Sequence, residues 1–256
     1  IVPGKYYIKN VASGKFLSNG AYWGTRSVLS EAGLEYEVKV SEAGTYTLVS
    51  NIKKAGNALR PSDGFNDQSG EWEIYAAEGG VTLFNGSKYF GYNGTDIPDY
   101  AEAAGDNELW QFVTADERKA LIGPGDDATV FISDADFILN NTNPTDWVGT
   151  KIGGESGSGT NIANNSNCER WNSGTYDTYQ VITGLPKGRY TLTAQAFYRH
   201  GNADQAAADA YEAGTEVSPI LYANGQEVKI KSVFSEAKTE VEGGWAVAAG
   251  KYFIPN

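Results

Sequence analysis

Apolar and polar positions follow a pattern that recurs three times in the first 113 residues. Each copy begins with a short apolar segment: Tyr6-Tyr7-Ile8, Tyr46-Thr47-Leu48 and Val81-Thr82-Leu83. A second segment follows in each copy: Lys15-Phe16-Leu17, Asn57-Ala58-Leu59 and Lys88-Tyr89-Phe90. Each copy ends on an aromatic segment: Glu35-Tyr36-Glu37-Val38, Glu71-Trp72-Glu73-Ile74 and Leu109-Trp110-Gln111-Phe112.

The spacing of these segments predicts the architecture. The final aromatic residues lie 36 and then 38 residues apart, and self-similarity at such a period indicates a repeat protein. Residue pairs that favour turns separate the segments: Ser13-Gly14, Asn19-Gly20, Ala43-Gly44, Gly79-Gly80, Asn85-Gly86 and Asn93-Gly94. Three copies built from short strands predict a closed β-barrel with pseudo-threefold symmetry.

The pattern changes after residue 113. Thr114 and Glu117 have the spacing of a capping box, which predicts a short helix over residues 115–122. The Gly/Pro-rich residues 123–127 are typical of a linker. We therefore expect a first domain at residues 1–114, a helix and linker at residues 115–127, and a second domain at residues 128–256.

Strands are expected again in the second domain, at residues 130–132, 179–182 and 189–198. The last of these has five residues on one face at period 2: Tyr190, Leu192, Ala194, Ala196 and Tyr198. The Gly/Ser/Asn-rich residues 153–166 are read as a loop, and the Ala-rich residues 202–214 as a loop or a helical turn. The expected fold class is all-β.

Composition narrows the range of partners. The chain has 256 residues and a net charge of −12, so repulsion from phosphate disfavours nucleic acid and anionic lipid as partners. Its single cysteine excludes an intrachain disulfide. No apolar stretch approaches the roughly 18 residues that a membrane-spanning helix needs.

The three aromatic endings and the Ser13-to-Leu17 opening resemble the ricin-type β-trefoil family, over residues 1 to about 115. The resemblance implies six hairpin-forming strand pairs and, in many members, carbohydrate binding. The family's repeats end in Gln-x-Trp, but the Gln position is Leu34, Gly70 and Glu108 here. The family's sugar-gripping Asp is replaced by Ser18, Arg60 and Gly91. The resemblance therefore supports the fold more strongly than the sugar site.

The second half resembles another family. The segments that carry this resemblance are residues 168–172, 176–180, 184–188 and 196–199. They look like the galactose-binding-like jelly roll of secreted and surface proteins from Bacteroides-type bacteria. The resemblance implies a β-sandwich that binds carbohydrate. Because such domains continue for several strands beyond the position of Asn256, the sandwich is expected to be incomplete at its C-terminal end.

Sugar binding needs an aromatic face beside a few fixed polar groups. On the jelly roll these would come from two loop-flanking segments: Glu169, Arg170, Trp171 and Asn172, and Tyr198, Arg199 and His200. The alternative is that Trp171 and Tyr198 pack in the core and that Glu169 pairs with an arginine. Five aromatic residues in loops of the barrel either bind ligand or plug the barrel ends: Tyr22, Trp23, Phe65, Tyr92 and Tyr100.

Candidates for metal binding and catalysis are few. Asp134 and Asp136 could contribute to a structural calcium site, which jelly rolls of the resembled type often hold, or could be solvated acids at a strand edge. His200 is the only histidine, and no Gly-x-Ser-x-Gly motif accompanies it. No catalytic residues are expected in this chain, and no cofactor is expected to be required.

These observations favour a non-catalytic glycan-binding protein of a secreted or cell-surface bacterial system, acting mainly through the second domain. Two alternatives remain open. The chain could be an accessory region of a larger glycoside hydrolase or protease, or it could be a protein–protein adhesion module with a purely structural barrel.

Overall fold

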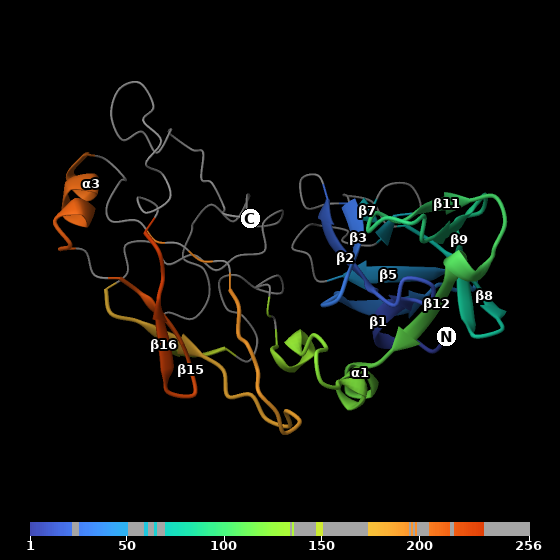
Figure 1. Ribbon diagram of the computed structural model, residues 1–256. Coiled ribbons are helices and arrows are strands. Elements are labelled where there is room, and N and C mark those ends of the chain that lie inside the picture. The colour runs from blue at the N-terminus through green and yellow to red at the C-terminus, as the bar shows by residue number, and fades with distance from the viewer. Residues whose placement is uncertain are drawn as a thin grey trace. The chain divides into compact units, whose positions relative to one another are not determined.

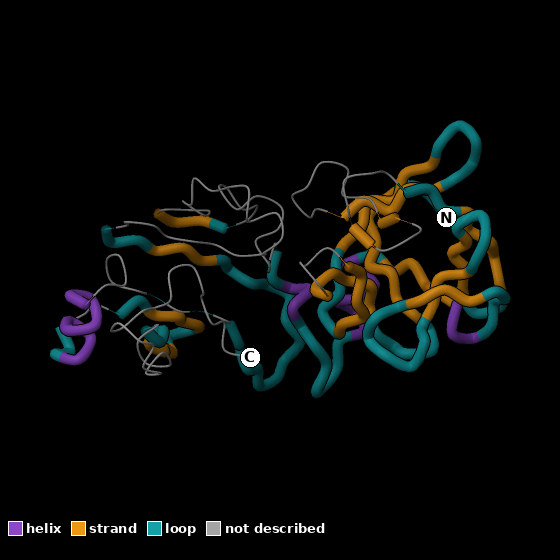
Figure 2. Tube along the Cα trace, turned by 90° about the horizontal axis from the view of Figure 1, so that it is seen from above, coloured by secondary structure: helices purple, strands orange, loops and turns teal. Residues whose placement is uncertain are grey.

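The computed structural model describes residues 1–21, 26–50, 59–60, 64–65, 70–133, 135, 147–150, 174–194, 196, 198, 205–215 and 218–232. Strands predominate in these residues, which confirms the all-β class (Figure 2). The chain divides into two compact units, Ile1–Lys187 and Gly188–Asn256, and each is described by itself.

Six strands of the first unit close into a barrel (Figure 1): β1 (Gly4–Asn10), β4 (Glu35–Val40), β5 (Tyr46–Ser50), β8 (Glu73–Ala77), β9 (Gly80–Phe84) and β12 (Leu109–Val113). All pairings are antiparallel, and they run in the order β1, β4, β5, then β8, β9, β12 and back to β1. A bridge between Tyr46 and Trp72 joins β5 to the start of β8 and completes the ring.

Three short hairpins lie between the barrel strands. They pair β2 (Phe16–Ala21) with β3 (Arg26–Ser30), β6 (Leu59–Arg60) with β7 (Gly64–Phe65), and β10 (Tyr89–Gly91) with β11 (Asp99–Ala101). Each copy of the repeat therefore contributes two barrel strands and one hairpin, which is the β-trefoil arrangement. The predicted threefold barrel is confirmed, and its copies are the strand sets β1–β4, β5–β8 and β9–β12.

The matched positions of the three copies form the barrel core. Side chains alternate between the two faces of a strand, so one position in two points inward. The inward positions that carry the repeat are fully buried: Ile8, Leu48 and Leu83, and Tyr36, Trp72 and Trp110. Phe90 packs among them, with its ring centroid 5.4 Å from those of both Trp72 and Trp110. The positions that recur along the sequence are thus the positions whose side chains form the core.

Most of the predicted turns lie where the sequence indicated. Gly44 and Gly79, with φ of 83° and 85°, adopt left-handed backbone conformations in the β4–β5 and β8–β9 turns, and glycine does so without steric cost. The Asn19-Gly20 prediction is wrong, because both residues lie inside β2. The register of β2 against β3 shifts between Asn19 and Ala21, so the extra residue is accommodated in a β-bulge.

Helix α1 (Ala115–Leu121) confirms the predicted capping box. The Thr114 hydroxyl accepts a hydrogen bond from the Glu117 N–H at 3.2 Å, and the Thr114 N–H donates to Glu117 Oε2 at 2.8 Å. The Thr114 hydroxyl also donates to Glu117 Oε2 at 2.7 Å. The bond from the Thr114 N–H, and after it the bond from the hydroxyl, lower the pKa of Glu117. The helix therefore begins at a locally encoded signal.

Thr114→Ala is expected to lower the free energy of unfolding by about 1 kcal/mol, because the first turn of α1 loses its side-chain acceptor. Thr114→Ser keeps the hydroxyl and is the matched control. Urea unfolding followed by tryptophan fluorescence measures both variants. Equal stability of the alanine and serine variants would show that the cap contributes nothing.

The strand predicted at residues 130–132 is wrong. Residues Thr129–Phe131 form a 3₁₀ turn, in which the Ile132 N–H donates to the Thr129 carbonyl at 2.8 Å. The Asp127 carboxylate accepts from the Thr129 N–H at 2.7 Å. A side chain that bonds the backbone two residues ahead favours a turn over an extended strand.

A two-stranded sheet joins β13 (Val148–Thr150) to β14 (Asp177–Tyr179) in the first unit. The strand predicted at residues 179–182 is therefore correct only at Tyr179. The next residue, Gln180, instead bonds the backbone of Ser133 with both ends of its amide, at 3.1 and 2.5 Å. The predicted division at residues 115–127 stays a prediction, because most of residues 134–173 lie outside the described part of the chain.

The second unit contains helix α3 (Gln205–Glu212) and a hairpin of β15 (Ile220–Ala223) and β16 (Gln226–Lys229). Within the Ala-rich stretch, residues Gln205–Glu212 are therefore helical. The strand predicted at 189–198 is wrong for residues 189–194, which form no strand. Of the two residues described beyond them, Ala196 and Tyr198, only Tyr198 makes a bridge, to Ser232. A period-2 pattern needs a paired neighbour to become a strand, and Tyr190 and Leu192 here are 45% exposed. The β-sandwich stays a prediction.

No helix in the described ranges is both long enough and apolar enough to span a membrane.

Candidate functional site

Most of the residues predicted to bind carbohydrate or metal lie outside the described residues: Glu169, Arg170, Trp171, Asn172, Arg199, His200, Asp134 and Asp136. Tyr198 is described and is half-buried. Its N–H donates to the Lys231 carbonyl at 3.0 Å, and its hydroxyl lies 3.1 Å from the Ser218 hydroxyl. Its assignment to a sugar site stays a prediction.

The loop aromatics of the barrel divide into two groups. Tyr92 and Tyr100 are half-buried and pack against the barrel core, which fits the plugging alternative for most of each ring. The backbone of Phe65 lies in β7, whereas Tyr22 and Trp23 lie outside the described residues.

The third copy carries the best-defined polar surface of the barrel. Its cap, residues 91–108, runs from the end of β10 through β11 to a 3₁₀ turn at Asp106–Glu108. Gly91 stands where the resembled family has its sugar-gripping Asp, and Glu108 stands where that family has Gln. In the first copy the matching position, Ser18, is buried, and the Arg60 side chain of the second copy lies outside the described residues.

Gly91 has no room for a side chain. A Cβ atom there would lie 2.7 Å from the Asn107 carbonyl oxygen, 2.8 Å from Glu108 Cγ and 2.9 Å from Glu108 Oε1. A contact of 2.7 Å with backbone cannot be relieved by a rotamer change. The missing Asp is thus explained by geometry, because the Glu108 side chain occupies the space that its Cβ would need.

Glu108 brings a carboxylate to the same place. The residue is 8% exposed, and its Oε2 accepts from the Gly105 N–H at 2.8 Å. Its Oε1 accepts no hydrogen bond from the described residues and is not among their buried unpartnered atoms, so it reaches solvent. The third copy therefore keeps an acceptor, which comes from the 3₁₀ turn and not from the end of β10.

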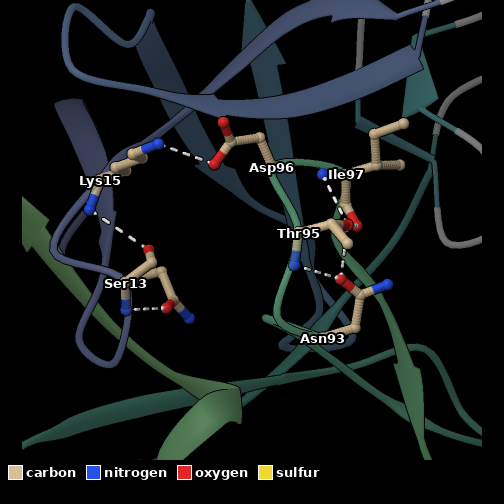
Figure 3. Close-up of polar contacts among 7 residues, drawn as sticks. Ser13, Lys15, Asn93, Thr95, Asp96 and Ile97 are labelled. Carbon is tan, nitrogen blue, oxygen red and sulfur yellow. Dashed lines mark hydrogen bonds and ion pairs between the residues drawn. The ribbon is translucent and has the colours of Figure 1, made fainter.

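The loop beside this carboxylate is fixed to the first copy (Figure 3). Lys15 Nζ lies 2.8 Å from Asp96 Oδ1, and the Leu29 N–H donates to the Asp96 carbonyl at 2.7 Å. The hydrogen bond that the Lys15 ammonium donates to Asp96 is the main reason that the pKa of Lys15 is raised. The side chain and the backbone of Asp96 thus both anchor the loop.

A second set of bonds shapes the tip of the loop. Asn93 Oδ1 accepts from the N–H of Thr95 at 3.0 Å and from its hydroxyl at 2.7 Å (Figure 3). At the base of the cap, the Asn107 carbonyl accepts from the Tyr92 N–H at 2.9 Å and from Asn10 Nδ2 at 2.8 Å. A polar frame held by this many bonds needs little reordering on binding.

The cap has the groups needed to bind hydroxyl-rich ligands. Glu108 Oε1 is an acceptor, the exposed Asn107 amide can donate and accept, the exposed Asn93 amide nitrogen can donate, and Tyr92 and Tyr100 contribute half-buried rings. No set of three His, Cys, Asp or Glu side chains is grouped for metal binding in the described residues. The sequence signal that could have indicated this site is the combination of Gly91 at the position of the family's Asp with Glu108 at the position of its Gln.

Comparisons with known proteins add similarities of limited extent. No protein-family model matches this chain, and no curated protein matches it. Among solved structures, the Rhizoctonia solani agglutinin is 21% identical with a TM-score of 0.35, and 44% of this chain matches 96% of the agglutinin. The Macrolepiota procera ricin B-like lectin in complex with lactose is 16% identical with a TM-score of 0.37, over 44% of this chain and 96% of that one.

A third similar structure is an enzyme. The Clostridium perfringens endo-β-galactosidase that releases GlcNAcα1-4Gal is 15% identical with a TM-score of 0.38, and 44% of this chain matches only 33% of it. The match thus spans about a third of that enzyme's length. At such TM-scores the trefoil assignment depends on the strand pairing of this chain itself, and nothing about a ligand follows.

Proposed function

We propose that this chain is a non-catalytic carbohydrate-binding protein. The observation that carries the proposal is the third-copy cap, where Glu108 Oε1, which accepts no hydrogen bond from the described residues, lies beside Gly91. A rigid β frame that presents loops with polar groups is a common support for binding sites. The frame here presents one carboxylate oxygen, two exposed side-chain amides and two tyrosines within a single cap.

Sugars fit this set of groups better than other ligands do. A carboxylate oxygen accepts strongly from sugar hydroxyls, and side-chain amides can both donate and accept. The cap is acidic as well, with Asp96, Asp99, Glu102 and Asp106 exposed around it. Anionic ligands such as phosphate esters would be repelled, so neutral glycans are the expected class.

We further propose a second glycan site in the C-terminal half, formed by Glu169, Arg170, Trp171, Asn172, Tyr198, Arg199 and His200. Two weak sites in one chain would gain by avidity on a polymeric ligand. The proposed setting is a secreted or cell-surface bacterial system, supported by the sequence resemblance of this half. A structural calcium held with Asp134 and Asp136 belongs to the same proposal.

A glycan array and polysaccharide pull-downs test the function. The chain is expected to bind at least one neutral glycan class, and Trp171→Ala is expected to weaken binding to polymers more than binding to short oligosaccharides. A wild-type chain that binds nothing across host and plant glycans would refute the proposal. Retained folding of the variant is checked by circular dichroism.

Two other proposals remain as alternatives. The chain would be an accessory region of a glycoside hydrolase or protease if the same reading frame encodes a catalytic domain. It would be a protein–protein adhesion module if Trp171→Ala and cap variants leave every glycan interaction unchanged while protein partners bind.

A further inference from the structure

A row of outward-facing aromatic and acidic side chains runs from the last strand of the second copy, β8, onto the first two strands of the third copy, β9 and β10. Glu73 on β8 lies opposite Phe84 on β9, and Phe84 lies opposite Tyr89 on β10. The neighbours Ile74, Leu83 and Phe90 face the core, so these three point to the outer face. We call Glu73, Phe84 and Tyr89 the third-copy row.

The rings of this row are close together and accessible. Phe84 and Tyr89 have centroids 4.8 Å apart, and Tyr75, which is 46% exposed, has its centroid 6.2 Å from that of Phe84. The Tyr75 hydroxyl donates to Glu73 Oε2. This bond fixes the carboxylate beside the rings.

An equivalent row runs from β12 of the third copy onto β1 and β2 of the first, and it already binds a cation. Gln111 of the third copy, paired with Lys9 of the first, matches Glu73 paired with Phe84, and Phe16 opposite Lys9 matches Tyr89. The guanidinium carbon of Arg118, from helix α1, lies 4.1 Å from the Phe16 ring centroid and 4.5 Å from that of Tyr7. Lys9 Nζ lies 5.9 Å from the same Phe16 ring. Phe16 is thus covered by positive charge.

The third-copy row differs in two ways that both favour a cation from outside. Phe84 replaces Lys9, which removes a positive charge and adds a ring, and Glu73 replaces Gln111, which adds a negative charge. Among the described residues no cation stacks on the rings of Tyr75, Phe84 or Tyr89.

Lys88 does not fill this place, because its ammonium lies 2.7 Å from Glu102 Oε1. Lys15, at the matching position of the first copy, makes a similar ion pair with Asp96 beside the arginine-covered ring. A lysine at this position is therefore compatible with a bound guanidinium.

We propose that Glu73, Phe84 and Tyr89, with Tyr75 beside them, form a docking site for an arginine side chain of a partner protein. A guanidinium is flat, stacks on aromatic faces and is weakly hydrated, and the neighbouring carboxylate supplies the opposite charge. The row lies on the open wall of a sheet, whereas small-molecule sites are usually concave. An arginine presented by a protein surface fits such a wall.

The test is an NMR titration of the full chain with N-acetyl-arginine amide, read at the tyrosine and phenylalanine ring signals. Signals of Tyr75 and Tyr89 are expected to shift with this probe and not with N-acetyl-citrulline amide, which has the same shape without the charge. Phe84→Lys gives the row the residue of the first copy and should preserve the fold. It is expected to weaken arginine binding about fivefold, and Glu73→Gln about threefold.

Glu37→Gln is the matched control, because Glu37 has the position of Glu73 in the first copy and its loss changes net charge equally. It should leave binding unchanged. Three outcomes would each overturn the proposal. The citrulline probe could shift the ring signals as much as the arginine probe does, or Glu37→Gln could weaken arginine binding as much as Glu73→Gln does. A neutral glycan could also produce the same ring shifts. The site is independent of the third-copy cap, so its failure leaves the glycan proposal standing.

Discussion

Trp110→Ala is expected to lower the free energy of unfolding by about 4 kcal/mol, since large-to-small changes at fully buried tryptophans cost about 3–5 kcal/mol. The side chain is 0% exposed and stacks on Phe90 at an interplanar angle of 7°. Its indole N–H donates to the Phe90 carbonyl at 2.8 Å. Alanine would leave both a cavity and a buried carbonyl without its donor.

Urea unfolding measures this loss, and two controls locate its origin. Trp110→Phe keeps a ring in the core but loses the N–H, so it is expected to cost about 2 kcal/mol. Tyr75→Ala removes an exposed ring on the outer face and is expected to cost under about 1 kcal/mol. A loss at Trp110 no larger than that at Tyr75 would contradict the position of Trp110 in the core.

Arg118→Ala is expected to cost about 3 kcal/mol, because it removes a buried cation together with its hydrogen bonds. The residue is 3% exposed, and its guanidinium donates to the carbonyls of Ala32 and Glu31. The same group stacks between Tyr7 and Phe16. Removing it would leave two carbonyls without donors and detach α1 from the barrel.

Hydrogen exchange of helix α1 tests whether the helix detaches from the barrel, separately from the loss of overall stability. Arg118→Lys keeps the charge but loses the planar guanidinium with its several donors. The amide hydrogens of α1 should therefore exchange faster than in the wild type and slower than in Arg118→Ala. Unchanged protection of α1 in both variants would show that the helix is held to the barrel by other contacts.

The sequence predicts the barrel well because one period governs its core. Ile8, Leu48 and Leu83 recur at matched positions, and each is buried where the pattern places it. The capping box at Thr114 is equally local, since its bonds span three residues. Patterns fail where a partner strand is required, as at residues 189–194, or where a side chain bends the backbone, as Asp127 does before residue 130.

The candidate site was only half visible in the sequence. The absence of Asp at Gly91 could be read directly. The compensating position of Glu108 could not, because it depends on how the 3₁₀ turn brings that side chain over Gly91. The role of Arg118 is likewise tertiary, since its contacts lie more than 80 residues away in the chain at Glu31 and Ala32.

The central claim is that the carboxylate of Glu108 binds a glycan in the third-copy cap. Its most direct test is the affinity of Glu108→Gln for the best glycan of the array, measured by calorimetry beside Asp106→Asn, which removes a nearby exposed carboxylate. We expect Glu108→Gln to weaken binding about tenfold, through loss of a charge-assisted hydrogen bond, and Asp106→Asn to leave it unchanged. Wild-type affinity in Glu108→Gln would contradict the claim.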